Sequence, residues 1–247
     1  MSELSIHVES LLKRFNLTTM RQCLGEVDQL AQQQDWGYLR FLEELLEREQ
    51  QMRHERLIQR LLKQSSLPEC KTLANLDTAK LPPPVRRQLD VLLEGVFVEK
   101  NVNVLAFGLP GRGKTHFLCA VARELILQHQ VKVWFTPAFK LVQHLLQAKE
   151  ALRLNEALKK LDRYDLILVD DIGYVQHTRS EMEVLFNFLA ERYERGSLMI
   201  TSNLAFSHWE QIFHNPMTAM AAIDRLVHHS VILEFTGESQ RMETKKK

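Results

Sequence analysis

The sequence has few cysteines, no long apolar run and almost no net charge. Its three cysteines, at positions 23, 70 and 119, form no Cys-x-x-Cys pair, so neither a disulfide framework nor a zinc site is indicated. No apolar stretch is long enough to span a bilayer, and the first residues lack the pattern of an export signal. We therefore expect a cytoplasmic protein with no membrane part. The formal net charge of +1 neither implies nor excludes nucleic acid, because acidic residues elsewhere can offset a basic patch.

The first quarter of the chain is predicted to be entirely helical. Apolar residues recur there at helical spacing, and strand patterns are lacking. Residues 17–20 and 34–37 carry the capping and breaking residues that separate helices, which gives three or four helices. Serine and proline then replace this periodicity. We expect a helical domain over residues 1–64, a linker over 65–85 and a second domain over 86–247.

The last of these helices carries a basic stripe. Its members share one sector of the helix and are Arg53, Arg56, Arg60 and Lys63. Two interpretations stay open. The stripe is either a solvated face that pairs with Glu47, Glu49 and Glu55, or a surface for a nucleic-acid phosphate backbone.

The second domain alternates apolar strands with helical segments. Strands are expected over 102–107, 131–136, 165–170, 197–202 and 231–235. Helices are expected over 86–97, 116–130, 139–146, 155–161, 181–195 and 217–227, and near Trp209. This order predicts an α/β fold with a parallel sheet covered by helices on both faces. Ligands of such sheets bind at the carboxyl ends of the strands.

The strand over 102–107 runs into a phosphate-binding loop. The loop has the pattern Gly-x-x-x-x-Gly-Lys-Thr, and its residues are Gly108, Leu109, Pro110, Gly111, Arg112, Gly113, Lys114 and Thr115. Its backbone N–H groups can converge on phosphates, Lys114 can reach the β- and γ-phosphates, and the Thr115 hydroxyl can ligate Mg²⁺. The helix that follows adds the positive end of its dipole.

Two carboxylates end the strand over 165–170. Asp170 is expected to hold Mg²⁺ opposite Thr115, and Asp171 to orient or deprotonate an attacking water. The plainer interpretation is a paired Asp that caps the turn at Gly173.

Two further polar residues follow in chain order. Asn203 ends the next strand, where its amide can reach the γ-phosphate or the water, although Asn at a strand end is often a turn residue. Arg225 lies on a late helix, where a guanidinium can neutralise developing phosphate charge or simply pair with Asp224.

Taken together, these motifs resemble the IstB-type AAA+ ATPases, the helper proteins of bacterial insertion sequences. The resemblance rests on five segments and on the N-terminal region: Gly108–His116, Leu166–Gly173, Thr201–Asn203, Asp224–His228 and Gly237–Arg241. It implies an AAA+ domain that binds ATP and Mg²⁺ and hydrolyses ATP, assembles on duplex DNA as an oligomer, and stimulates a transposase. It also implies that Asn203 is the first sensor and that Arg225 acts on a neighbouring subunit's site. Asp171 stands where many AAA+ relatives have Glu, and Gln240 stands where the family often has Tyr.

Other functions remain open. A replicative helicase loader of the DnaC type has a similar ATPase domain and would act on single-stranded DNA. A small-molecule kinase would share the phosphate loop but give Asn203 and Arg225 no role. A nucleotide-switched adaptor without catalysis would not need Asp171 for turnover.

Overall fold

The computed structural model describes residues 3–173, 178–204 and 226–237. The chain forms two compact units, Met1–Arg60 and Leu61–Lys247, which we describe separately. In the described part of the chain, no helix is long and apolar enough to cross a membrane.

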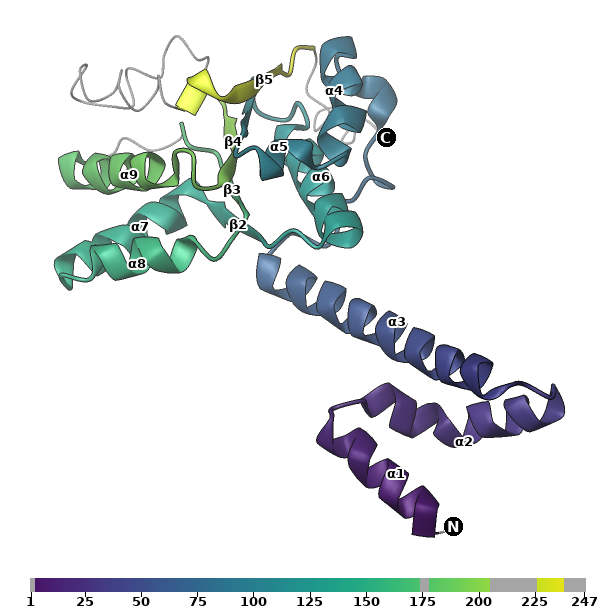
Figure 1. Ribbon diagram of the computed structural model, residues 1–247. Coiled ribbons are helices and arrows are strands. Elements are labelled where there is room, and N and C mark those ends of the chain that lie inside the picture. Colours follow the sequence, from purple (N-terminus) through teal and green to yellow (C-terminus); the bar gives the residue numbers. More distant parts are fainter. Residues whose placement is uncertain (1–2, 174–177, 205–225, 238–247) are drawn as a thin grey trace. The chain divides into compact units, whose positions relative to one another are not determined.

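The first unit is helical, as predicted. Its helices are α1 (Glu3–Arg14), α2 (Thr18–Gln33) and the first part of α3 (Tyr38–Ser65), drawn in purple and blue in Figure 1. Asn16 and Asp35, in the two connections, have positive φ angles of 56° and 51°, which end the preceding helices. Its core comprises Leu12, Met20, Val27 and Leu45.

A buried carboxylate fastens α3 to the start of α2. Oε2 of Glu49 accepts hydrogen bonds from the backbone N–H groups of Thr19 (2.7 Å) and Met20 (3.0 Å). Its Oε1 accepts from Nε of Arg53 at 2.7 Å. Burial alone would raise the pKa of Glu49, but the bonds from Met20 and Arg53 outweigh it and lower that pKa below its ordinary value.

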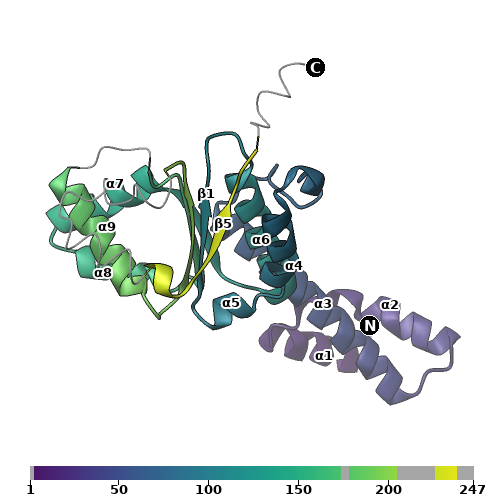
Figure 2. The same cartoon turned by 90° about the horizontal axis from the view of Figure 1, so that it is seen from above.

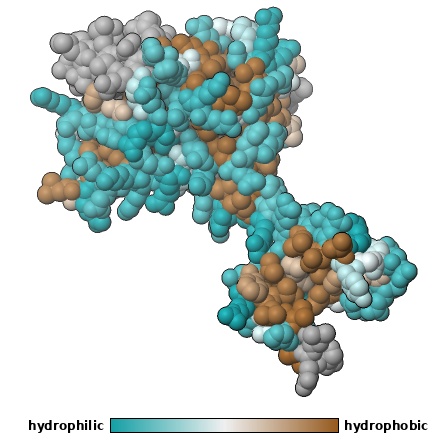
Figure 3. Space-filling view, viewed as in Figure 1, coloured by the Kyte–Doolittle hydropathy of each residue, from teal (hydrophilic) through white to brown (hydrophobic). Residues whose placement is uncertain are grey.

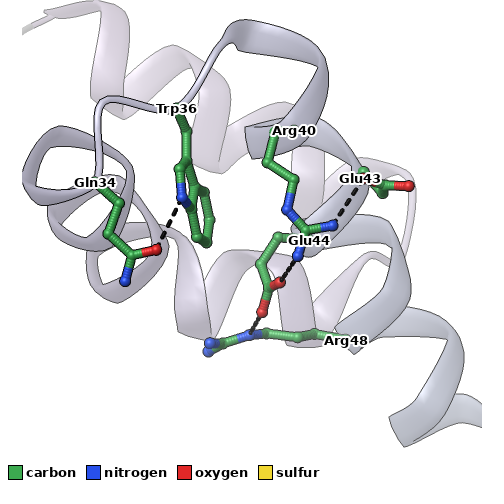
Figure 4. Close-up of polar contacts among 6 residues, drawn as sticks. All are labelled: Gln34, Trp36, Arg40, Glu43, Glu44 and Arg48. Carbon is green, nitrogen blue, oxygen red and sulfur yellow. Dashed lines mark hydrogen bonds and ion pairs between the residues drawn. The ribbon is translucent and has the colours of Figure 1, made fainter.

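The start of α3 carries its own ion-pair network, shown in Figure 4. Arg40 pairs with Glu43 (2.8 Å) and Glu44 (3.5 Å), and Arg48 pairs with Glu44 (2.8 Å). The Arg40 guanidinium also lies over the Trp36 ring, 5.4 Å from its centroid. Basic residues of this part of the helix are therefore neutralised within the unit.

Apolar side chains are also exposed on the helical unit, where Figure 3 shows them gathered on one face. The exposed large apolar residues of this unit are Ile6 and Leu11 on α1, Phe15 directly after α1, and Tyr38, Leu39, Leu42 and Leu46 on α3. Leu39, Leu42 and Leu46 follow helical spacing and form one stripe.

The second unit is built on the predicted parallel sheet. Its strands are β1 (Asn103–Phe107), β2 (Val133–Pro137), β3 (Leu166–Asp170), β4 (Ser197–Ser202) and β5 (Ser230–Glu234). They lie in the order β2-β3-β4-β1-β5, and all four pairings are parallel. Because β1, β3 and β4 are internal, their side chains are almost all buried, which explains their unbroken apolar sequences.

Helices cover both faces of the sheet, as Figures 1 and 2 show. On one side lie α7 (Ala138–Glu150), α8 (Leu154–Leu161) and α9 (Arg179–Arg192), and on the other α4 (Pro83–Leu93) and α6 (Lys114–His129). Helix α6 contacts four of the strands and is buried along most of its length. The three-layer α/β fold is thus confirmed.

The single helix expected over 86–97 is wrong. The structure has α4 and then a short α5 (Val96–Glu99). Gly95 separates them because its φ is +76°, a left-handed conformation that ends a helix. The helix expected near Trp209 lies outside the described residues, as does most of the helix expected over 217–227, whose last two residues are described and helical.

The segment between α3 and α4 packs against α6. Nε2 of His116 lies 3.0 Å from the Thr72 carbonyl oxygen, and Nη2 of Arg123 donates to the Pro68 carbonyl at 3.4 Å. The buried residues of the segment are Leu67, Leu76 and Leu81. It also contains a short 3₁₀ helix, Thr78–Lys80.

One buried guanidinium joins the amino ends of β3 and β4. Arg192, 2% exposed, donates to the carbonyls of Leu161, Tyr164, Asp165 and Ser197. Burial lowers the pKa of Arg192 to about 10, so it stays charged at neutral pH. A Cβ at Gly196 would lie 2.2 Å from Nη2 of Arg192, so a larger residue there would force the guanidinium to shift.

Candidate nucleotide-binding site

The glycine-rich loop joins β1 to α6 at the carboxyl end of the sheet. Gly108, Gly111 and Gly113 have φ angles of 145°, 83° and 90°, which only glycine adopts readily. At Gly108 a Cβ would also lie 2.4 Å from the Phe235 carbonyl oxygen. Leu109 and Pro110 are exposed at the tip, and α6 begins immediately after Gly113. Helix N-terminal N–H groups and a glycine-rich backbone together suit an anionic phosphate group.

Lys114 is held at the base of the loop. Its side chain is 6% exposed, and Nζ donates to the carbonyls of Gly108 (2.6 Å) and Leu109 (3.0 Å) and to Oδ1 of Asn203 (2.7 Å). The ammonium group is therefore already positioned between the loop and the end of β4.

Thr115 and Asp170 lie together, as their expected shared role requires. Oγ1 of Thr115 donates to Oδ1 of Asp170 at 2.7 Å. The two side chains offer the hard oxygen donors that Mg²⁺ prefers, and such sites are usually completed by phosphates and water. Among the described residues no group of three or more His, Cys, Asp or Glu side chains could hold a metal. A cation here would depend on the nucleotide for its remaining ligands.

The Asp171 side chain bonds Asn203. Nδ2 of Asn203 donates to Oδ1 of Asp171, while its Oδ1 accepts from Lys114. One amide thus connects the lysine of the loop to the carboxylate after β3. Asp171 has a φ of 64°, a conformation uncommon for a residue other than glycine.

Thr201 belongs to the same cluster, although the sequence analysis assigned it no role. Its hydroxyl bonds Asp170 and the Asp171 backbone at 2.7 Å each. Side chains alternate along a strand, so Thr201 lies on the opposite side of β4 from Ser202, and Asn203 follows the strand directly. This alternation was the available signal, but the hydroxyl of a buried β-branched residue is not otherwise distinctive.

Arg112 ties the loop to the end of β5. Its Nη1 donates to the Phe235 carbonyl at 3.0 Å, and the Phe235 ring packs edge-on against Phe117 of α6. The bulky cation at this loop position therefore has a structural partner. Arg225 and Arg241 lie outside the described residues.

The basic stripe lies on α3, and all four members are exposed. The Arg53 guanidinium is already paired, because it donates to the Glu49 carboxylate and to the Asn16 carbonyl, the latter at 2.9 Å. For Arg56, Arg60 and Lys63, the described part of the chain supplies no carboxylate partner.

The sequence matches a known protein family over most of its length. Residues 10–247 match the model of the family described as IstB-like ATP binding protein. The chain belongs to this family. It is 37% identical to an insertion-sequence ATP-binding protein of Sinorhizobium fredii, over 94% of this chain and 78% of the relative. It is 35% identical to the IS21 ATP-binding protein of Pseudomonas aeruginosa, over 100% of this chain and 87% of the relative.

Solved structures share the fold of the second unit. A DnaI structure gives a TM-score of 0.58 at 21% identity, covering 70% of this chain and 100% of that one. The DnaC helicase loader gives 0.55 at 16% identity, covering 62% and 89%. DnaA from Aquifex aeolicus gives 0.57 at 18% identity, covering 73% and 55%. At these identities the likeness concerns the fold alone.

Proposed function

We propose that this IstB-like protein is an ATP-dependent helper of transposition. It binds and hydrolyses ATP, assembles on duplex DNA, selects or remodels the target, and stimulates a transposase. The observation that carries the ATPase part is the convergence of Lys114, Thr115, Asp170, Asp171 and Asn203 at one edge of the sheet. The DNA part rests on the family, whose named relatives belong to insertion sequences.

The loop residues 108–115 hold the phosphates of ATP. Lys114 exchanges its bonds to loop carbonyls for phosphate oxygens, and the N-terminus of α6 adds further donors. Thr115 and Asp170 hold Mg²⁺, which neutralises charge on the β- and γ-phosphates when bound.

Asp171 orients or deprotonates the attacking water, and Asn203 senses the γ-phosphate through the amide that already bridges Lys114 and Asp171. Arg225 completes the ATP site of a neighbouring subunit. ATP between subunits then adds binding energy to their interface, so ATP favours assembly and hydrolysis loosens it. The side chain of Asp171 is shorter than the Glu that many AAA+ relatives have, so we expect slow hydrolysis. Slow hydrolysis would set how long the assembled oligomer lasts.

The exposed face of α3 is the proposed DNA contact. Arg56, Arg60 and Lys63 recur at spacings of four and three residues, so their charges share one side of the helix. Unlike Arg40 and Arg48, they have no carboxylate partner in the described chain. Neutralising phosphates would release counterions from DNA and stabilise binding.

Sedimentation with duplex DNA tests the proposal. The wild type and the Lys114→Ala and Arg225→Ala variants are compared under ATP, ADP and no nucleotide. We expect large complexes only for the wild type with ATP. Asn101→Ala is the control, because its amide bonds the Glu194 carbonyl, away from the loop.

If the protein does not bind duplex DNA with ATP, with ADP or without nucleotide, the proposal is wrong. Binding to single-stranded DNA together with a helicase would then favour a loader of the DnaC type. Transfer of phosphate to a small molecule would favour a kinase.

A further inference from the structure

The hydroxyl of Thr201 lies at the centre of the polar cluster. Thr201 is on β4, opposite Ala106 of β1, and is 1% exposed. Its Oγ1 lies 2.7 Å from Oδ1 of Asp170 and 2.7 Å from the backbone nitrogen of Asp171. A single buried oxygen therefore contacts both residues that end β3.

The direction of these two bonds is fixed by chemistry. A backbone N–H can only donate, so Oγ1 of Thr201 must accept from Asp171. A hydroxyl has one proton, and the remaining neighbour is the carboxylate of Asp170, which accepts it. The hydroxyl thus both donates and accepts a hydrogen bond. Valine has the same shape but can form neither bond.

Each bond restrains a different part of the site. Oδ1 of Asp170 accepts from Thr115 and from Thr201, so the carboxylate is held from α6 and from β4 at once. The second bond satisfies the N–H of Asp171, whose φ of 64° is sparsely populated for a non-glycine residue. That conformation directs the Asp171 carboxylate to Asn203.

We propose that Thr201 is a positioning residue for ATP hydrolysis, which fixes the Asp170 carboxylate for Mg²⁺ and the backbone conformation of Asp171. This inference rests on the proposed ATPase function. Thr201 acts through the two aspartates, as residues that hydrogen-bond metal-binding carboxylates do.

Thr201→Val and Thr201→Ser form the decisive pair. Thr201→Val should raise the Mg²⁺ concentration needed for half-maximal ATPase activity, and lower kcat, by about 10–100-fold. The KM for ATP should change much less, because the loop and Lys114 are intact. Thr201→Ser should restore both values. The matched control is Ser197→Ala on the same strand, which removes a buried hydroxyl bonded to the Phe97 carbonyl.

A second measurement needs no turnover. Hydrogen exchange of the Asp171 amide should be faster in Thr201→Val than in the wild type, Thr201→Ser or Ser197→Ala, at equal thermal stability or after correction for it. Unchanged exchange, or a Thr201→Val variant with wild-type Mg²⁺ dependence, would overturn the inference. Lack of ATPase activity in the wild type would instead refute the proposed function, while the exchange result would still report whether Thr201 restrains Asp171.

Discussion

Nζ of Lys114 and Oδ1 of Asn203 are 2.7 Å apart, and the other end of the same amide bonds Asp171. A γ-phosphate that draws Lys114 away changes the hydrogen bonds of Asn203, and through them those of Asp171.

Replacing Asn203 with Ala should slow hydrolysis more than it weakens ATP binding. The Asp171 carboxylate loses the donor that orients it, whereas the loop and Lys114, which hold the phosphates, stay intact. We expect kcat to fall about 10²-fold, in line with the loss of one preorganised donor. Steady-state ATPase assays and binding of a fluorescent ATP analogue separate the effects. Equal losses in binding and kcat would contradict this role.

Asp171→Asn should abolish most turnover while ATP still binds. An amide of the same size cannot accept a proton from water, and loss of a general base costs about 10²–10⁴-fold in kcat. Single-turnover hydrolysis measures the step directly. Wild-type turnover in this variant would show that Asp171 is dispensable for hydrolysis.

Replacing Arg56, Arg60 and Lys63 together with Gln should weaken duplex binding. The slope of log K against log salt concentration should fall by about 0.9 for each DNA phosphate that the variant no longer neutralises. Fluorescence anisotropy at several salt concentrations measures both quantities. Arg40→Gln is the control, since Arg40 is paired within α3. An unchanged salt slope in the triple variant would exclude this face of α3.

Arg53, the fourth member of the predicted stripe, should behave differently. It bonds the buried Glu49 and the Asn16 carbonyl, so Arg53→Gln should lower the stability of the helical unit. We expect a loss of about 1.5–3 kcal/mol, the usual value of a hydrogen bond to a charged group. Urea unfolding followed by circular dichroism measures it. A larger effect on DNA affinity than in the triple variant would assign Arg53 to the DNA contact instead.

Acid should destabilise the helical unit through Glu49. Its folded-state pKa is lowered, so the charged form adds stability above the ordinary glutamate pKa of about 4.3, and that stability is lost as pH falls through the folded value. Thermal unfolding between pH 7 and pH 3 measures the effect. Glu49→Gln should be less stable at pH 7 and less sensitive to acid. An equally steep acid dependence in that variant would assign the effect to other carboxylates.

The fold was predictable because the pattern of apolar residues along each strand or helix depends on which of its faces are buried. Strands β1, β3 and β4 are covered on both faces, so their sequences are continuously apolar, and β4 was predicted with its observed bounds. The break at Gly95 was missed because a glycine within a helical pattern has two outcomes. It can be tolerated in a helix or, when its φ becomes positive, end one.

Site residues could be named from the sequence where a local pattern marks them, as the ends of apolar strands mark Asp170, Asp171 and Asn203. The loop is a local structure with a fixed spacing, so Gly108 to Thr115 could be named from the sequence. Thr201 could not, because its role depends on the register that places β4 beside β3 and brings its hydroxyl to Asp170. The division between paired Arg53 and exposed Arg56 likewise depends on how α3 packs on α2, since Glu49 turns toward Thr19 and Met20.

The hydrogen bonds of Arg192 should make several segments of the second unit unfold locally together. Its guanidinium donates to carbonyls at the end of α8, before β3 and at the start of β4, which lie up to 31 residues from Arg192 in sequence. Detaching any one of these segments would leave a buried cation and its acceptors unsatisfied together, which is costly. These segments should therefore exchange their amide hydrogens as one cooperative unit, with shared rates set by a common opening event.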